Sequence, residues 1–434
     1  MLLVVATDDG TVSVFDESYA EHCGPGGVGP KAHRTFRVGL IWPSQPRPVH
    51  IHVDFHVAVV SVNGAVLAMK DSDNCFSTWD ITTGLFIRRF VGHDDSSAPN
   101  DEKLSCKCMP ELHAWPEDEC PAVGHRSEIT AMAISHLGDR IASADAAGII
   151  LVWDASNAAV LHTHEFEYME PMAIEFSPDG QYFVVTDTGG FVVEYDTVGG
   201  DDYGYMKPFH PCCNSWYRCA IRAVSWTPDS KQYICGYSGG QVRKAVSVGF
   251  DDYFQGDATV GNVLDLKCSE DAVNALAISP DGKFVAVAGA RIIGELGNGG
   301  RICGFVAVYN SPKNTLRWKN WAKPGHDGGV ITLSFSLDGK QLASAGMDNF
   351  VRLWDPQDGT RLQAFQMLTP ATPSWAKEQL LTAIKTVSVT FCADLEETPE
   401  RSERRLAFAQ GHHKRLGALE VLSPDLMKTI GLMV

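Results

Sequence analysis

Apolar and polar positions alternate along two short runs on either side of a tight turn in the later part of the chain. Val330, Leu333 and Phe335 come before the turn, and Leu342 and Leu353 come after it. Such alternation is typical of strands that bury one face, because successive side chains point to opposite sides of a sheet. The turn contains an Asp-Gly pair, which tolerates the backbone angles of a tight hairpin. The pattern predicts antiparallel strands joined by short turns.

The same arrangement occurs twice, in residues 124–154 and in residues 325–355. Each segment begins with Gly-His and ends with Trp-Asp. Each also has a serine 18 positions after the histidine and a tryptophan 28 positions after it, namely His125, Ser143 and Trp153 in the first segment and His326, Ser344 and Trp354 in the second. Three distinctive residues in one register indicate an internal repeat rather than coincidence.

These segments resemble the WD40 repeat, in which Gly-His and Trp-Asp bracket one blade of a β-propeller. The resemblance implies an all-β fold, with residues 1–434 forming a single WD40-type β-propeller of seven or eight four-stranded blades. It also implies a hydrogen-bonded network within a blade, made by His326, Ser344, Asp348 and Trp354. A buried indole N–H and imidazole need partners, and a hydroxyl and a carboxylate supply them.

The earlier repeat departs from this pattern at one position. Ala147 stands where Asp348 stands in the later repeat, and Asp145 lies two positions out of register. We therefore expect the network of the earlier repeat, which contains His125, Ser143 and Trp153, to be incomplete.

The other repeats follow the pattern less closely. In the second blade, Asp73 lies six positions before Trp79, which is the spacing between Asp348 and Trp354, so we expect Asp73 and Trp79 to join a network of the same kind. Irregular intervals between the predicted turns indicate that most blades carry loop insertions. The expected boundaries are an incomplete first blade at 1–41, a long inter-blade loop at 94–123 and a closing blade at 369–434.

The first 41 residues contain three of the four strands of a blade, and the innermost strand is the one they lack. Either the C-terminal part supplies this strand, or the chain begins partway into a longer protein. The same ambiguity leaves seven and eight blades as alternatives. Closure of the ring matters because an open edge leaves a row of unpaired backbone groups.

Composition restricts the partners and the compartment. The net charge is −17, and an acidic surface repels phosphate, so we expect no binding to nucleic acid or to a membrane. The first ten residues have no basic lead and only a short apolar run, so they do not predict a secretory signal. The 12 cysteines are then most simply reduced thiols. These features predict a cytoplasmic protein, with a nuclear location as the alternative.

Two sets of residues suggest chemistry. The His/Ser/Asp set is the combination that hydrolases use, but it recurs from blade to blade, whereas an active site is needed once. Thiols and imidazoles gather in one loop, where a zinc ion is the alternative to a plain surface loop: Cys106, Cys108, His113 and Cys120. Their spacing matches none of the standard zinc motifs, so we expect no metal and no cofactor.

The resemblance implies a scaffold that is not an enzyme and that binds proteins or peptides through its rim and the mouth of its central channel, within a larger complex. Two alternatives remain. A propeller hydrolase or lactonase needs acidic or histidine ligands around the channel, and the predicted innermost strands offer almost only apolar and small residues. A substrate receptor of a ubiquitin ligase often has an arginine two positions after Trp-Asp, where this chain has Thr82, Ser156 and Gln357.

Overall fold

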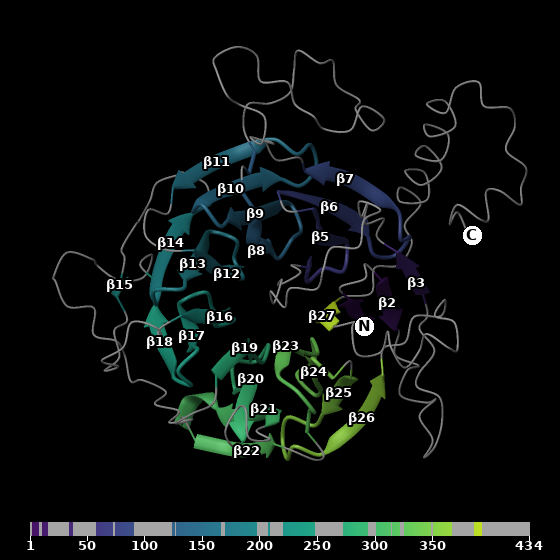
Figure 1. Cartoon of the computed structure of the whole chain (residues 1–434), viewed down its shortest axis with the longest axis vertical. Helices are drawn as coiled ribbons and strands as arrows, with labels where there is room; N and C mark the ends of the chain where they lie inside the picture. The colour runs from purple at the N-terminus through teal and green to yellow at the C-terminus, as the bar shows by residue number, and fades with distance from the viewer. Residues whose placement is uncertain are drawn as a thin grey trace, which may run out of the picture.

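The computed structural model shows a ring of antiparallel sheets arranged around a central axis (Figure 1). It describes residues 2–7, 11–15, 34–37, 58–72, 74–90, 124–125, 127–165, 170–197, 207–208, 220–247, 272–293, 301–313, 315–321, 325–348, 350–366 and 386–392. In this part of the chain there are seven sheets, six with four strands and one with three. The all-β prediction is confirmed.

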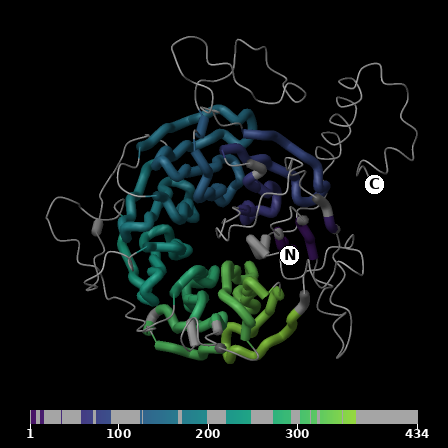
Figure 2. The backbone as a smooth tube through the Cα atoms, in the orientation of Figure 1, coloured from purple at the N-terminus to yellow at the C-terminus, as the bar shows by residue number. Residues whose placement is uncertain are grey.

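Consecutive strands along the chain fill one sheet after another, and Figure 2 traces the backbone around the ring. The first three such sheets contain β4 (Ala58–Val60), β5 (Val66–Ser72), β6 (Cys75–Asp80) and β7 (Phe86–Phe90); β8 (Ile129–Ile134), β9 (Arg140–Asp145), β10 (Ile149–Asp154) and β11 (Val160–Glu165); and β12 (Pro171–Phe176), β13 (Tyr182–Asp187), β14 (Phe191–Asp196) and β15 (Lys207–Pro208).

The next three sheets contain β16 (Ile221–Trp226), β17 (Gln232–Tyr237) and β18 (Val242–Val246); β19 (Ala272–Ile278), β20 (Phe284–Ile293), β21 (Arg301–Asn310) and β22 (Thr315–Trp321); and β23 (Val330–Phe335), β24 (Leu342–Gly346), β25 (Phe350–Trp354) and β26 (Arg361–Gln366). A short 3-10 helix, Ser311–Lys313, follows β21. No helix in the described ranges has the length and hydropathy needed to cross a membrane.

The remaining sheet joins segments from the two ends of the described chain. Its order is β27 (Thr386–Cys392), β1 (Leu2–Thr7), β2 (Thr11–Phe15) and β3 (Arg34–Arg37). β27 pairs antiparallel with β1, with Leu2 opposite Cys392 and Thr7 opposite Thr386. The innermost strand that residues 1–41 lack is therefore supplied by β27, from the C-terminal part of the chain. The expected 94–123 loop and the rest of the closing blade expected at 369–434 lie outside the described residues.

The innermost strands form a continuous ring. β4, β8, β12, β16, β19, β23 and β27 each contact the next, and β27 also contacts β4. β27 lies near the centre of the ring in Figure 1, between β23 and the start of the chain. Since each innermost strand has a neighbour on both sides, the ring is closed within the described residues.

The tight turns between the first and second strands explain why the chain reverses where it does. At the turn before β24, Ser336 Oγ donates to Asp338 Oδ1 at 2.7 Å and accepts from the Gln341 backbone N–H at 2.8 Å. Gly339 adopts a φ of 69°, which is costly for any residue with a Cβ. Two other turns have a Ser-Pro-Asp-Gly sequence and an equivalent hydroxyl-carboxylate bond, those at Ser177 and Ser279.

The hydrophobic core lies between neighbouring sheets rather than at a single centre. Ile150 and Val152 of β10, for example, cluster with Phe183 of the next sheet. Trp318 of β22 lies beside Trp354, with ring centroids 6.1 Å apart, and joins the last two sheets in the same way. The alternating residues of each strand therefore bury both faces, and the ring is stabilised by sheet-to-sheet packing.

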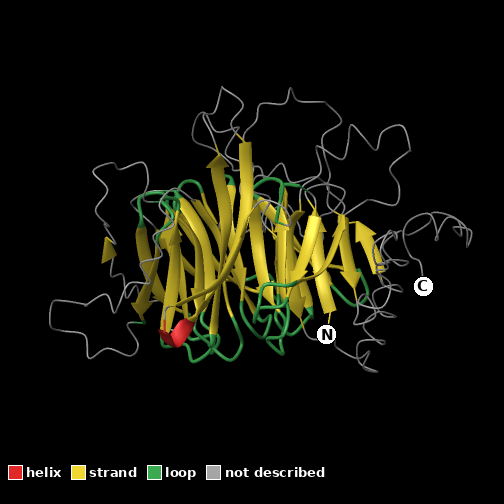
Figure 3. Cartoon of the chain, turned by 90° about the horizontal axis from the view of Figure 1, so that it is seen from below, coloured by secondary structure: helices red, strands yellow, loops and turns green. Residues whose placement is uncertain are grey.

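The ring has two faces, and Figure 3 shows the strands running between them. In five innermost strands the pairing register shifts by one residue near the start of the strand, so each has a β-bulge at the same end. We call the face at this end the bulged face. The tight turns between first and second strands lie on the opposite face, because neighbouring strands are antiparallel.

Candidate functional site

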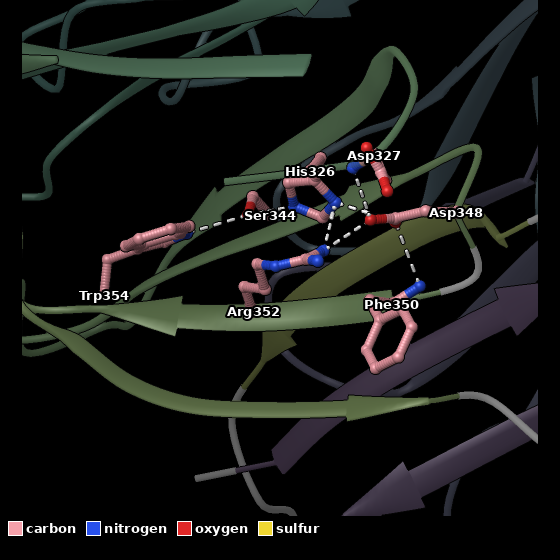
Figure 4. A network of polar contacts seen from close by, with 7 residues as sticks. All are labelled: His326, Asp327, Ser344, Asp348, Phe350, Arg352 and Trp354. Carbon is pink, nitrogen blue, oxygen red and sulfur yellow. Dashed lines mark hydrogen bonds and ion pairs between the residues drawn. The ribbon is translucent and has the colours of Figure 1, made fainter. Parts of the chain in front are cut away.

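The polar network predicted in the later repeat is present in the last sheet (Figure 4). Trp354 Nε1 donates to Ser344 Oγ at 2.8 Å, and Ser344 Oγ lies 2.8 Å from His326 Nε2. On the other side of the ring, His326 Nδ1 lies 2.9 Å from Asp348 Oδ1. These four residues connect the turn before β23 with the second and third strands of the sheet.

Sequence reasoning missed a fifth member of this network, Arg352 on β25. Its Nη1 donates to Asp348 Oδ2 at 2.8 Å and lies 2.6 Å from His326 Nδ1. Arg352 lies two positions before Trp354, on the same strand, so alternation places the two side chains on the same face of the sheet. That spacing is the signal that would have identified it.

The network has a defined charge state. Burial lowers the pKa of His326 below its ordinary value, outweighing the hydrogen bond to Asp348, and the Arg352 charge lowers it further. Burial opposes the ionisation of Asp348, but contacts with His326 and Arg352 together bring the pKa of Asp348 below its usual range. At neutral pH we therefore expect an ion pair between Asp348 and Arg352 beside a neutral imidazole.

The earlier repeat has a complete network, so the prediction that it would be incomplete is wrong. Trp153 Nε1 donates to Ser143 Oγ at 2.7 Å, and Ser143 Oγ lies 2.6 Å from His125 Nε2. The carboxylate comes from Asp145, whose Oδ2 lies 3.1 Å from His125 Nδ1. Ala147, the position expected to be decisive, is exposed.

A glycine in the later repeat explains why the two networks take their carboxylate from different positions. Asp145 lies two positions after Ser143, and the residue two positions after Ser344 is Gly346. A Cβ on Gly346 would lie 2.7 Å from His326 Nδ1 and 3.2 Å from Asp348 Oδ1. A side chain at this position therefore points at the histidine. In the earlier repeat an aspartate fills the place, and in the later repeat the glycine leaves room for a carboxylate from the turn.

The second blade lacks the expected bond at its tryptophan. Trp79 Nε1 is buried and has no hydrogen-bond partner among the described residues, and Asp73 lies outside them. The position ten residues before Trp79, where the other repeats have serine, holds Met69. A thioether is a weak acceptor, so the change from serine to methionine accounts for the missing bond.

The buried networks have the atoms of a Ser-His-Asp triad but not its accessibility. Ser344 and Ser143 have exposed fractions of 0%. Each hydroxyl already contacts an indole N–H and an imidazole, so neither faces a space that a substrate can enter. The arrangement is suited to holding three strands in register.

The predicted zinc alternative falls on residues that the structure does not describe: Cys106, Cys108, His113 and Cys120. Among the residues it does describe, no group of three or more metal-ligating side chains gathers at one point.

A second set of residues, three of them polar, lies at the channel mouth on the bulged face. The bulged residues of five innermost strands are Thr130, Met172, Arg222, Asn274 and Ile331. Arg222 is the charged member of this set and is exposed. Its Nη1 donates to Asn274 Oδ1 at 3.1 Å, and Asn274 Nδ2 donates to the Val330 carbonyl at 3.1 Å. Three neighbouring sheets are thus connected around the mouth.

The ring of antiparallel sheets and its two Trp-Ser-His-Asp networks define a β-propeller with WD-type repeats. Residues 118–154, 262–291 and 318–355 match the WD40 family, described as "WD domain, G-beta repeat". These three matches and the ring of antiparallel sheets together support the WD40 family for this chain.

Among curated proteins, the chain is 25% identical over 313 residues to Actin-interacting protein 1 of Drosophila melanogaster, covering 68% of this chain and 44% of that one. It is 25% identical over 163 residues to WD repeat-containing protein 1 of Xenopus tropicalis, covering 36% of this chain and 24% of that one. The chain thus spans less than half the length of these relatives.

A solved structure supports the fold. The β-propeller domain of Cps50 (Swd1) from Myceliophteria thermophila has a TM-score of 0.50 and 13% sequence identity, and covers 73% of this chain and 88% of that one.

Proposed function

We propose that this chain is a non-catalytic scaffold that binds other proteins or peptides through its rim and the mouth of its central channel, within a larger complex. The observation that carries the proposal is the location of the polar side chains. The hydrolase-like sets are buried inside blades, where His125 and His326 have exposed fractions of 1%, whereas Arg222 is exposed at the channel mouth. A rigid ring that presents its turns and mouth is suited to docking.

The net charge of −17 supports protein partners over nucleic acid or an anionic membrane, because an acidic surface repels both. We also propose a cytoplasmic location, with a nuclear one as the alternative. One relative is named for an interaction with actin, so purified actin is the first protein to test for direct binding.

The test is affinity purification of the tagged full chain, followed by identification of the partner and reconstitution with the purified partner. Two single variants locate the contact: Met347→Asp on the bulged face and Leu137→Asp on the opposite face, at side chains 39% and 72% exposed. We expect one variant to lose the partner while the other retains it, with both keeping the wild-type circular dichroism spectrum.

Recovery of the chain alone as a monomer, together with turnover of a small substrate, would refute the scaffold proposal and favour a propeller enzyme. Retention of the partner by both variants would show that neither face makes the contact and that the outer rim must be tested next.

A further inference from the structure

Arg222 is a fixed cation at the channel mouth. It is the bulged residue of β16, so the pairing passes from Ile221 to Ala223 and leaves Arg222 out of the ladder. Its neighbours in the strand are buried, but Arg222 is exposed. A bulge commonly re-aims a side chain in this way, and here the result is a guanidinium on the bulged face.

The position of the guanidinium is set by Asn274 on the adjacent innermost strand. The amide oxygen of Asn274 accepts from Arg222 Nη1, and the amide nitrogen donates to the Val330 carbonyl. Both ends of the amide are therefore engaged, which fixes its orientation. The other N–H groups of the Arg222 guanidinium remain available to a further acceptor. Two parallel N–H donors of a guanidinium match the two oxygens of a carboxylate.

No carboxylate among the described residues pairs with Arg222. Partial desolvation by the surrounding strands lowers the pKa of Arg222. Four other cations of the described residues have an acidic partner: Lys70 with Glu128, Lys283 with Asp281, Lys340 with Asp338 and Arg352 with Asp348. Arg222 is thus a held, accessible positive charge on a chain whose net charge is −17.

An apolar side chain lies close to Asn274. Met347, in the turn after β24, is 39% exposed. A Cβ placed on Gly329 would lie 3.8 Å from Asn274 Nδ2 and 3.8 Å from Met347 Sδ, so these two side chains lie close to each other beside Gly329. Methionine adapts to different apolar partners, which suits a docking surface.

The geometry points to Arg222 as the anchor of a docking site for an acidic segment of a partner protein. The side-chain carboxylate of an Asp or Glu in that segment pairs with the guanidinium, and a nearby apolar side chain lies on Met347. This inference rests on the proposed scaffold function. A polyanion such as nucleic acid does not fit, because one cation on an acidic chain cannot offset the repulsion of many phosphates. A single carboxylate does fit, since the two charges pair locally.

The test is selection of peptides from a displayed library of random 12-residue sequences on the full chain, with each selected peptide then synthesised with an amidated C-terminus. We expect the selected peptides to carry Asp or Glu within a few residues of an apolar side chain. Arg222→Met should weaken their binding about tenfold, because a hydrogen bond to a charged group is lost. Arg222→Glu should shift the selection towards Lys- and Arg-containing peptides.

The matched control is Lys340→Met, which removes one positive charge from the opposite face, where the Lys340 side chain is 81% exposed. This control should bind the acidic peptides as the wild type does. Equal binding by wild type and Arg222→Met, selection of peptides without acidic residues, or selection of no peptides would overturn the inference. Binding that disappears on C-terminal amidation would assign the site to a terminal carboxylate and overturn the side-chain assignment.

These outcomes are separate from those of the scaffold proposal. A partner that binds wild type and Arg222→Met equally leaves the scaffold in place and removes Arg222 as its anchor.

Discussion

Replacing Trp354 with phenylalanine tests whether the blade network stabilises the fold through its hydrogen bonds. Trp354 has an exposed fraction of 0%, and its Nε1 donates to Ser344 Oγ at 2.8 Å. Phenylalanine keeps an aromatic ring in the core but removes the N–H and part of the ring. The Ser344 hydroxyl then keeps only its contact with His326.

The magnitude follows from two contributions. Loss of a buried hydrogen bond that leaves one partner in place costs about 1–2 kcal/mol. Loss of about 40 Å² of buried apolar surface costs about 1 kcal/mol at roughly 25 cal/mol per Å². We therefore expect Trp354→Phe to lower the free energy of unfolding by about 2–3 kcal/mol.

The chain supplies its own control at Trp79. Its Nε1 is buried without a partner among the described residues, so Trp79→Phe removes an uncompensated N–H along with the ring area. Because these two effects oppose each other, we expect a change within about 1 kcal/mol of zero.

The assay is reversible urea unfolding followed by tryptophan fluorescence and circular dichroism, with the slope of the transition checked in each variant. Ser344→Ala alone and combined with Trp354→Phe completes a double-mutant cycle, for which we expect a coupling of about 1 kcal/mol. Equal destabilisation at Trp354 and Trp79, or a coupling of zero, would refute the reasoning.

Three further predictions follow from buried groups. Burial raises the pKa of Glu175 to about 8, above its unfolded value, so ionisation on unfolding favours the unfolded state increasingly from pH 4.5 to 8. Glu175→Gln should therefore melt higher than wild type at pH 8 and about equally at pH 4, and a constant difference across this range would exclude the assignment. Gly304→Ala should cost about 1–3 kcal/mol, because its Cβ would lie 2.7 Å from His326 Cβ; a wild-type Tm would contradict this crowding. Asp145→Ala should lower the Tm, and adding Ala147→Asp should not restore it. Restoration would show that a carboxylate at position 147 can also reach His125.

Spacing alone predicted the later network because its residues are fixed by strand register. The two repeats share the intervals from histidine to serine and to tryptophan. In both, the histidine lies just before the first strand, and the serine and tryptophan lie on the second and third strands. The aspartate is different, because a carboxylate can reach the histidine either from the end of the second strand or from the following turn. Asp145 uses the first route and Asp348 the second. Sequence spacing alone cannot distinguish these two routes. The distinguishing fact is structural: Gly346 has no side chain at the end of the second strand, where Asp145 lies in the earlier repeat.

The mouth of the channel could not be predicted in the same way. Arg222 and Asn274 lie in bulges, where the pairing skips one residue. Alternation gives no sign of a bulge, so both residues read as ordinary strand positions in the sequence. The source of the first blade's innermost strand was also open, because a pairing between distant segments leaves no local pattern.

Ring closure through β27 has a consequence for synthesis of the protein. Leu2 and Cys392 are paired although they lie 390 positions apart, so β1 leaves the ribosome long before its inner neighbour exists. Until then one edge of β1 is available to other nascent chains, and edge strands of this kind are prone to wrong pairing. We therefore expect newly made protein to depend on chaperones that shield the N-terminal segment, and a version with the β27 segment moved ahead of β1 to fold with less aggregation.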